Sequence, residues 1–104
     1  MDIIVLITTK NVSQANKIAR KLLDEKLIAC ANILKGVQSL FWWQGKIEHS
    51  NEVLLILKTR RRCFQNIVST VKVLHSYEVP EIIALPIVDG YDKYLKWLSQ
   101  SVGG

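Results

Sequence analysis

Two segments with helical periodicity, each following an extended apolar run, constrain the fold of this chain more than any other feature. In both segments apolar residues recur at the i, i+3, i+4 and i+7 spacing of an amphipathic helix. These residues are Ala15, Ile18, Ala19, Leu22 and Leu23 in the first segment and Phe64, Ile67, Val68, Val71 and Leu74 in the second. The sequence therefore predicts one helix with an N-cap at Ser13 and another from about Cys63 to His75.

Four extended stretches alternate with these helices. They run from Ile3 to Ile7, from Ile28 to Trp43, from Ile47 through the apolar run Val53–Leu57, and from Ile82 to Leu85. The first is apolar without alternation, which predicts a central strand that is buried on both faces. Gly45 predicts a hairpin turn between the second and third strands, and Gly36 predicts a bulge or bend within the second.

A last helix is expected over residues 91–100, with Tyr94, Leu95 and Trp97 towards its apolar side. The complete order, β-α-β-β-α-β followed by a helix, specifies an α+β domain of the ferredoxin-like type. In that arrangement one antiparallel sheet carries both main helices on one face, and the second and fourth strands form its edges. Because 104 residues is a usual domain length, residues 1–104 are assigned to a single domain.

Three consecutive aromatic residues, Phe41, Trp42 and Trp43, precede the hairpin turn. Such a cluster on a projecting hairpin is hard to bury within so small a subunit. Exposed edge strands also invite pairing with another chain. We therefore expect another subunit to cover these three residues and the open face of the sheet.

Charge and composition limit which partners the chain is expected to bind and where in the cell it is expected to lie. The net charge of +5 gives a weak preference for anionic partners. The apolar run at the N-terminus is too short for a signal peptide or a membrane span, so no membrane association is expected. Cys30 and Cys63 lie far apart with no C-x-x-C pair, which predicts reduced thiols, no structural disulfide and a cytoplasmic protein.

The segment from His75 to Ile82 brings an imidazole, a phenol and two carboxylates to a helix-to-strand corner. Pro80 disfavours a helical conformation for the residue before it, so the helix is expected to end near His75. A cap or an interface hydrogen-bond donor is one interpretation of His75, and a metal or ligand contact is the other. Glu78 and Glu81 would suit general acid–base chemistry, but no nucleophile or second base accompanies them.

The densest basic run is Lys58 to Arg62. It is interpreted as a solvated strand-to-helix loop, with a phosphate or carboxylate site at the N-terminus of the second helix as the alternative. Cys63 follows this run and would act as a thiolate sensor only if it were exposed. Cys30, within a strand, is interpreted as an inert buried thiol.

Eight segments, taken together and in order, resemble the CutA divalent-cation tolerance proteins over nearly the whole chain. They are Ala29–Asn32, Ser39–Trp43, Gly45–Ile47, Glu52, Lys58–Thr59, His75–Tyr77, Pro80–Glu81 and Tyr94–Trp97. The resemblance implies a ferredoxin-like subunit in a tight homotrimer that is related in shape to the PII signalling proteins. It also implies a non-enzymatic, cytoplasmic protein tied to the response to copper and other divalent metal ions, with no settled biochemical activity.

A protein of this type would hold its ligand in clefts between subunits, near Lys58, His75, Tyr77 and Glu81. The expected ligand is a small anion or a divalent metal, and no cofactor is required. Some bacterial members of the family carry a Cys and a second His where this chain has Ile7 and Leu74. His75 is then the main candidate for a copper ligand, and we predict that Cu(II) binds only weakly.

Two other functions are compatible with the same element order. An RNA-binding RRM needs aromatic residues in its third strand to stack bases, whereas residues 53–57 are aliphatic, so nucleic acid is disfavoured as a partner. An acylphosphatase-like enzyme needs an arginine in a phosphate cradle, and the loop after the first strand is Thr-Thr-Lys-Asn. The fold alone does not choose between these functions.

Overall fold

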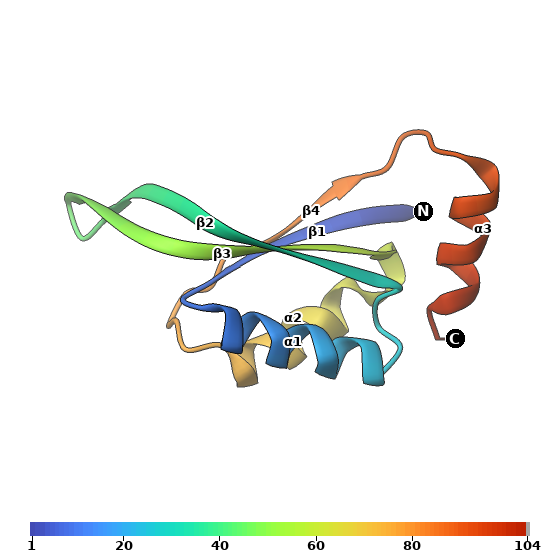
Figure 1. Ribbon diagram of the computed structural model, residues 1–104, viewed down its shortest axis with the longest axis horizontal. Helices are drawn as coiled ribbons and strands as arrows, with labels where there is room; N and C mark the ends of the chain where they lie inside the picture. Colours follow the sequence, from blue (N-terminus) through green and yellow to red (C-terminus); the bar gives the residue numbers. More distant parts are fainter. Residues whose placement is uncertain (104) are drawn as a thin grey trace.

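The computed structural model describes residues 1–103 and contains every helix and strand that the sequence predicts (Figure 1). Along the chain lie β1 (Asp2–Thr9), α1 (Val12–Asp24), β2 (Cys30–Trp43), β3 (Lys46–Arg60), a 3₁₀ turn (Arg61–Cys63), α2 (Phe64–Leu74), β4 (Ile82–Pro86) and α3 (Asp92–Ser101). The βαββαβ order with a terminal helix is thereby confirmed. Among the described residues, no helix combines the length and the apolar character that crossing a membrane requires.

The four strands form one antiparallel sheet in the order β2-β3-β1-β4, so β2 and β4 are its edges, as predicted. Helices α1 and α2 cover one face, and α3 stands at the end of the sheet that carries the N-terminus (Figure 1). The opposite face is called here the open face. Its apolar side chains are Ile4, Leu6, Leu54, Ile56, Ile83 and Leu85.

The hydrophobic core lies between the sheet and helices α1 and α2. Strand residues enter it at every second position, because successive side chains of a strand point to opposite faces. Its fully buried members include Val5, Ile7, Leu55 and Leu57 from the sheet, Ile18 and Leu22 from α1, and Ile67 and Val71 from α2. Burial of each such aliphatic side chain contributes about 1.5–3 kcal/mol, so this layer holds the subunit together.

The prediction that the first strand is buried on both faces is wrong for the subunit. Ile3, Val5 and Ile7 are at most 2% exposed, whereas Ile4 and Leu6 between them remain partly exposed. The apolar run of β3 shows the same alternation of buried and partly exposed residues. The subunit therefore covers one face of two strands whose sequences are apolar on both.

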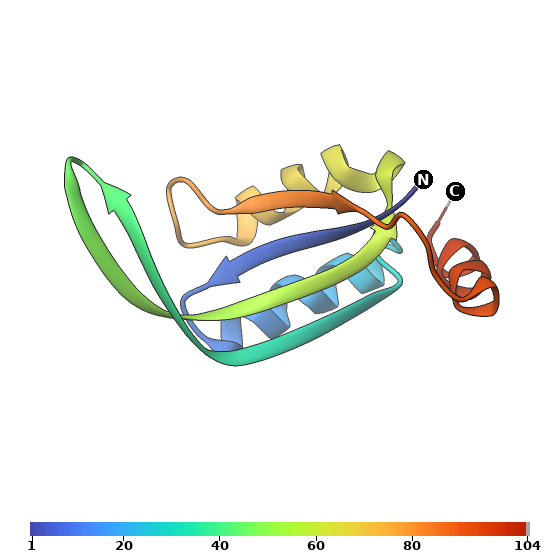
Figure 2. The same ribbon diagram turned by 90° about the horizontal axis from the view of Figure 1, so that it is seen from above.

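Strands β2 and β3 continue past the sheet as a long curved hairpin (Figure 2). The predicted bulge is confirmed, because the register shifts between Leu34 and Val37 and Gly36 has a φ of +77°. The predicted turn is confirmed as well. Gln44 and Gly45 both have positive φ, 51° and 78°, the combination that matches the twist of a two-residue hairpin.

Two details of the helices differ from the predictions. Asn11 caps α1 in place of Ser13, because its side-chain oxygen accepts a hydrogen bond from a first-turn backbone N–H at 2.8 Å. In α3 the buried residue is Leu98, while Tyr94 and Trp97 are each more than 40% exposed. Leu95, the third residue predicted on the apolar side of α3, is half-buried, so the prediction holds better for Leu95 than for the two aromatic residues.

Candidate functional site

The corner between α2 and β4 begins at His75, where the sequence predicts the helix to end. His75 is the C-cap of α2: its backbone is extended, and its N–H donates to the carbonyl of Val71 at 2.8 Å. The chain then runs without regular structure to Ile82, the first residue of β4. This short connection, residues 75–81, is called the corner below.

The imidazole of His75 is buried and uses both of its nitrogens within the fold. Nε2 donates to the backbone carbonyl of Thr8 at 2.7 Å, and Nδ1 accepts from the backbone N–H of Tyr77 at 3.1 Å. Because a carbonyl only accepts and an amide N–H only donates, these bonds define a neutral ring with its proton on Nε2. The ring thus has no free lone pair for a metal, and its geometry supports the interpretation of His75 as a structural cap.

Tyr77 connects the corner to β3. Its hydroxyl donates to Oε2 of Glu52 at 2.7 Å, and Glu52 is only 8% exposed. Burial, together with the hydrogen bond and the negative charge of Glu52, raises the pKa of Tyr77 to about 12. Tyr77 therefore remains a neutral hydrogen-bond donor at physiological pH.

Beside this pair a cleft of about 760 Å³ lies between the corner and the hairpin. It is called here the hairpin cleft, and it is lined by Thr8, by residues 38–41, 43, 48–50 and 52 of the hairpin, and by residues 77–79 and 81 of the corner. A volume of this size is typical of small-molecule sites. Of the residues predicted to form a ligand site, Tyr77 and Glu81 lie in this cleft, together with Phe41 and Trp43.

The charge of the hairpin cleft is opposite to that of the whole chain. Four carboxylates line it, those of Glu48, Glu52, Glu78 and Glu81, and its lining includes no lysine or arginine. A small anion, one of the two ligand classes expected from the sequence, is therefore disfavoured within this subunit's cleft. The global charge of +5 was a poor guide to this cleft, because four glutamates line it and no lysine or arginine does.

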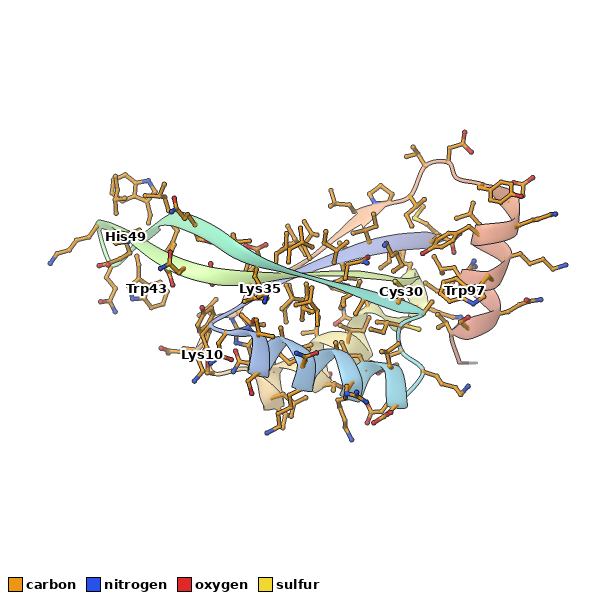
Figure 3. The ribbon with its side chains drawn as sticks, in the orientation of Figure 1. Lys10, Cys30, Lys35, Trp43, His49 and Trp97 are labelled. Carbon is orange, nitrogen blue, oxygen red and sulfur yellow. The ribbon has the colours of Figure 1, made fainter. Side chains whose placement is uncertain are left out.

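Lys58, the fourth predicted site residue, is not brought to this cleft. It lies on β3 six residues beyond Glu52, which corresponds to about 20 Å along a strand. Its ammonium group donates to the side-chain oxygen of Asn32 on β2, and Cys30 pairs with it across the two strands. Lys58 therefore belongs to the end of the sheet near α3, where Figure 3 shows Cys30 and Trp97.

The rest of the basic run makes contacts within the fold. Arg60 forms an ion pair with Asp2 at 2.9 Å, and Arg62 donates to the backbone carbonyl of Gly103.

Cys63 is 4% exposed, so it lacks the exposure that a thiolate sensor needs, while Cys30 is partly exposed, against the prediction that it is buried. Burial, and after it the neighbouring Cys30, raises the pKa of Tyr94.

The side chains whose types could ligate a metal are dispersed. Within residues 1–103, no three side chains of His, Cys, Asp or Glu converge closely enough to hold a metal ion. His49 lies on the projecting hairpin, far from Cys30 at the opposite end of the sheet (Figure 3). The carboxylates of the hairpin cleft therefore share one cavity without forming a chelating set.

Glu52 is the residue whose role the sequence did not indicate. Its position continues the open-face alternation of Leu54 and Ile56, so a charged side chain there interrupts an apolar series. That interruption was the one feature of the sequence that could have indicated a special role for Glu52. The role itself depends on the hydrogen bond from Tyr77, which lies 25 residues further along the chain.

Comparison with known proteins gives a consistent result. Residues 3–101 match the family described as CutA1 divalent ion tolerance protein. The divalent-cation tolerance protein CutA of Thermus thermophilus is 44% identical over 103 residues, which is 99% of this chain and 100% of that protein. The chloroplastic protein CutA of Arabidopsis thaliana is 44% identical over 100 residues, 96% of this chain and 55% of that protein. The chain thus spans about half the length of this plant relative.

Solved structures agree with the sequence relatives. The Thermus thermophilus divalent cation tolerance protein superposes with a TM-score of 0.97 at 44% identity, covering 99% of this chain and 100% of that one. The periplasmic divalent cation tolerance protein CutA from Archaeoglobus fulgidus superposes with a TM-score of 0.95 at 41% identity, again covering 99% and 100%. The similarity extends over the whole domain.

Proposed function

The chain belongs to the CutA1 divalent ion tolerance family, and on that premise we propose that it acts as a non-enzymatic homotrimer in the response to divalent metal ions, copper among them. Divalent-cation tolerance is what the names of its relatives state. The number of subunits and the likeness to the PII signalling proteins come from the family resemblance. Two features of this chain support assembly, the exposed apolar face of the sheet and the exposed hairpin.

The observation that carries the proposal is the uncovered apolar surface of the sheet. Ile83 and Leu85 on β4 are 49% and 47% exposed, and the side chains of β1 and β3 beside them are only partly covered. Monomeric proteins seldom expose a continuous apolar patch of this kind. Other copies of the chain are the proposed cover, because the sequence of β1 and β3 is that of strands buried on both faces.

The hairpin supports the same proposal. Trp42 is 73% exposed and pairs with Ile47, which is 64% exposed, and neither residue lines the hairpin cleft. We therefore assign Trp42 to the subunit interface, where a buried tryptophan contributes strongly to binding. Phe41 and Trp43, also predicted at the interface, line the hairpin cleft and border this contact.

The non-enzymatic role is supported by the chemistry of the corner. His75 is engaged through both nitrogens, and the pKa of Tyr77, raised to about 12, keeps its hydroxyl protonated. Neither group is poised as a base or a nucleophile near neutral pH.

The cytoplasm is the proposed location, supported by two free cysteines, although named relatives include chloroplastic and periplasmic proteins.

Sedimentation equilibrium over a wide range of protein concentration tests the assembly. We expect a mass about three times the 11.9 kDa subunit that persists on dilution. A single 11.9 kDa species at every concentration would overturn the trimer. A stable dimer would show that the chain associates with itself but would contradict the proposed number of three subunits.

A further inference from the structure

The corner is attached to the rest of the subunit by few bonds. Within residues 1–103, no backbone–backbone hydrogen bond involves residues 76–80, and the amide of Tyr77 bonds to the ring of His75 instead. The other hydrogen bonds that hold the corner join His75 to Thr8, Tyr77 to Glu52, and Ser76 to Gln14 of α1. The imidazole of His75 therefore supplies two of the bonds that fix this segment.

Burial adds little to this attachment. His75 is buried, but the residues from Ser76 to Glu81 are half-buried or exposed, and Val79 is 70% exposed. A segment with little buried apolar surface and few backbone hydrogen bonds opens at a low cost in free energy. The corner can therefore move locally when the bonds of His75 are lost.

Both bonds of the His75 ring require the neutral imidazole. Nε2 donates to the carbonyl of Thr8 at 2.7 Å, and Nδ1 accepts the N–H of Tyr77 at 3.1 Å. A proton from solvent can enter only at Nδ1, whose lone pair already receives that N–H. Two N–H donors would then face each other, so protonation of the ring breaks its bond with Tyr77.

The charged and titratable groups around the ring come from several elements. They are Lys72 in the last turn of α2, Tyr77, Glu78 and Glu81 of the corner, Glu52 of β3, and Lys10, the first charged residue after β1; α1 contributes the uncharged Gln14. Tyr77 contacts the ring, with the two ring centroids 4.6 Å apart, and Glu52 is reached through the hydroxyl of Tyr77. Because carboxylic acids generally take up protons about two pH units below an imidazole, mild acid tests the ring and not the carboxylates.

The corner is also a wall of the hairpin cleft. Residues 77–79 and 81 line one side, and the hairpin lines the other. The hydroxyl of Tyr77 joins the two sides, because it donates to Glu52 on β3 at 2.7 Å. A corner that moves away from β1 therefore changes the shape of this cleft.

We propose that His75 is an acid-sensitive latch of the corner. The neutral ring holds the corner against Thr8, and protonation at Nδ1 releases Tyr77 and opens the hairpin cleft on that side. Because a proton binds the released ring and not the bonded one, the open fraction increases as the pH falls, by up to about tenfold per pH unit below about 6.5, where a free imidazole titrates. This control by pH goes beyond the proposed metal response and does not depend on the number of subunits.

Solvent exchange of backbone amides, followed by NMR on the protein in its native assembly state, tests the latch. The quantity measured is the protection of the Tyr77 amide relative to an unstructured peptide at the same pH. We expect this protection to fall by about tenfold between about pH 6.5 and 5.5. The amide of Val5, in the central strand that pairs with β3 and β4, should keep its protection over the same range, because the opening is local.

Two matched substitutions identify the group that titrates. An asparagine at position 75 can accept the N–H two residues further on, as in an Asx turn, but it does not titrate. In His75→Asn the protection of the Tyr77 amide should therefore not depend on pH. His49→Asn removes the other imidazole of the chain, on the projecting hairpin (Figure 3), and should keep the tenfold fall.

Several results would overturn the proposal. They are constant protection of the Tyr77 amide in the parent protein, a fall that persists in His75→Asn, a fall that disappears in His49→Asn, and a parallel fall at Val5, which would indicate general unfolding. If His75→Asn does not fold, isotopic labelling of the histidine ring nitrogens in the parent protein decides instead. The ring of His75 should then gain its proton over the pH range in which the Tyr77 amide loses protection, and a ring that stays neutral there contradicts the latch.

Discussion

The two faces of the sheet have similar apolar sequences and very different surroundings. On the helix face Val5 and Leu55 are fully buried under α1 and α2, whereas on the open face Ile83 and Leu85 are about half exposed. Hydrophobicity alone therefore does not decide which side of a strand becomes the core of a subunit. The helices cover one face, and the other is left uncovered by the subunit.

The largest expected effect contrasts two adjacent leucines of β3. Leu55→Ala on the helix face should lower the free energy of unfolding by about 2–5 kcal/mol, because it removes buried methyl groups and leaves a cavity. Urea denaturation measures this loss. Leu54→Ala, the same change on the open face, should instead raise the protein concentration at which the assembly dissociates. Equal unfolding losses with unchanged association in both variants would contradict the distinction between the faces.

A smaller effect is expected at the corner that joins the helix layer to the sheet. His75→Ala removes two side-chain hydrogen bonds and leaves the carbonyl of Thr8 without its donor, which should cost about 1–3 kcal/mol. His49→Ala on the exposed hairpin should change stability by less than about 0.5 kcal/mol. Thermal denaturation compares the two.

The His75→Ala variant also tests the role of His75 in metal binding. Because both nitrogens of His75 are engaged, Cu(II) titration should give the same weak binding in His75→Ala as in the parent protein. A tight site that disappears with His75 would show that the ring exchanges its internal bonds for a metal.

The smallest expected effect depends on pH and concerns Tyr77 against Glu52. The pKa of Tyr77 is raised to about 12 from an ordinary value of 10.0, so its contribution to stability is complete below pH 10 and is lost as the pH rises through 12. Titration followed by phenolate absorbance should show a tyrosine that ionises at about 12. Tyr77→Phe should abolish that step, and its persistence in the variant would assign it to another residue.

Local patterns in the sequence were sufficient for the fold. The helical spacing, the bulge at Gly36 and the turn at Gly45 each depend on residues close together in the chain, and the structure confirms all three. The site was harder to predict, because the contact between Tyr77 and Glu52 depends on how the corner packs against the hairpin. Lys58 was grouped with that site by resemblance, although the length of β3 places it at the other end of the sheet.

Net charge was a misleading guide for a similar reason. The sum over the chain is +5, but folding brings four glutamates from two segments into one cleft and leaves the lysines outside. The apolar sequence of β1 was correctly read as that of a central strand. The prediction of burial on both faces failed for the subunit, where Ile4 and Leu6 stay partly exposed, and the proposed assembly would account for that apolar pattern.

Sedimentation velocity of an open-face variant tests the central claim most directly. Ile56→Glu places a charge in the middle of the open face, and Val73→Glu makes a comparable change at a site on α2 that is 84% exposed. If other copies cover the open face, Ile56→Glu should sediment as a subunit of 11.9 kDa with its helical circular dichroism retained, and Val73→Glu should remain assembled. An Ile56→Glu protein that assembles as fully as Val73→Glu would contradict the account.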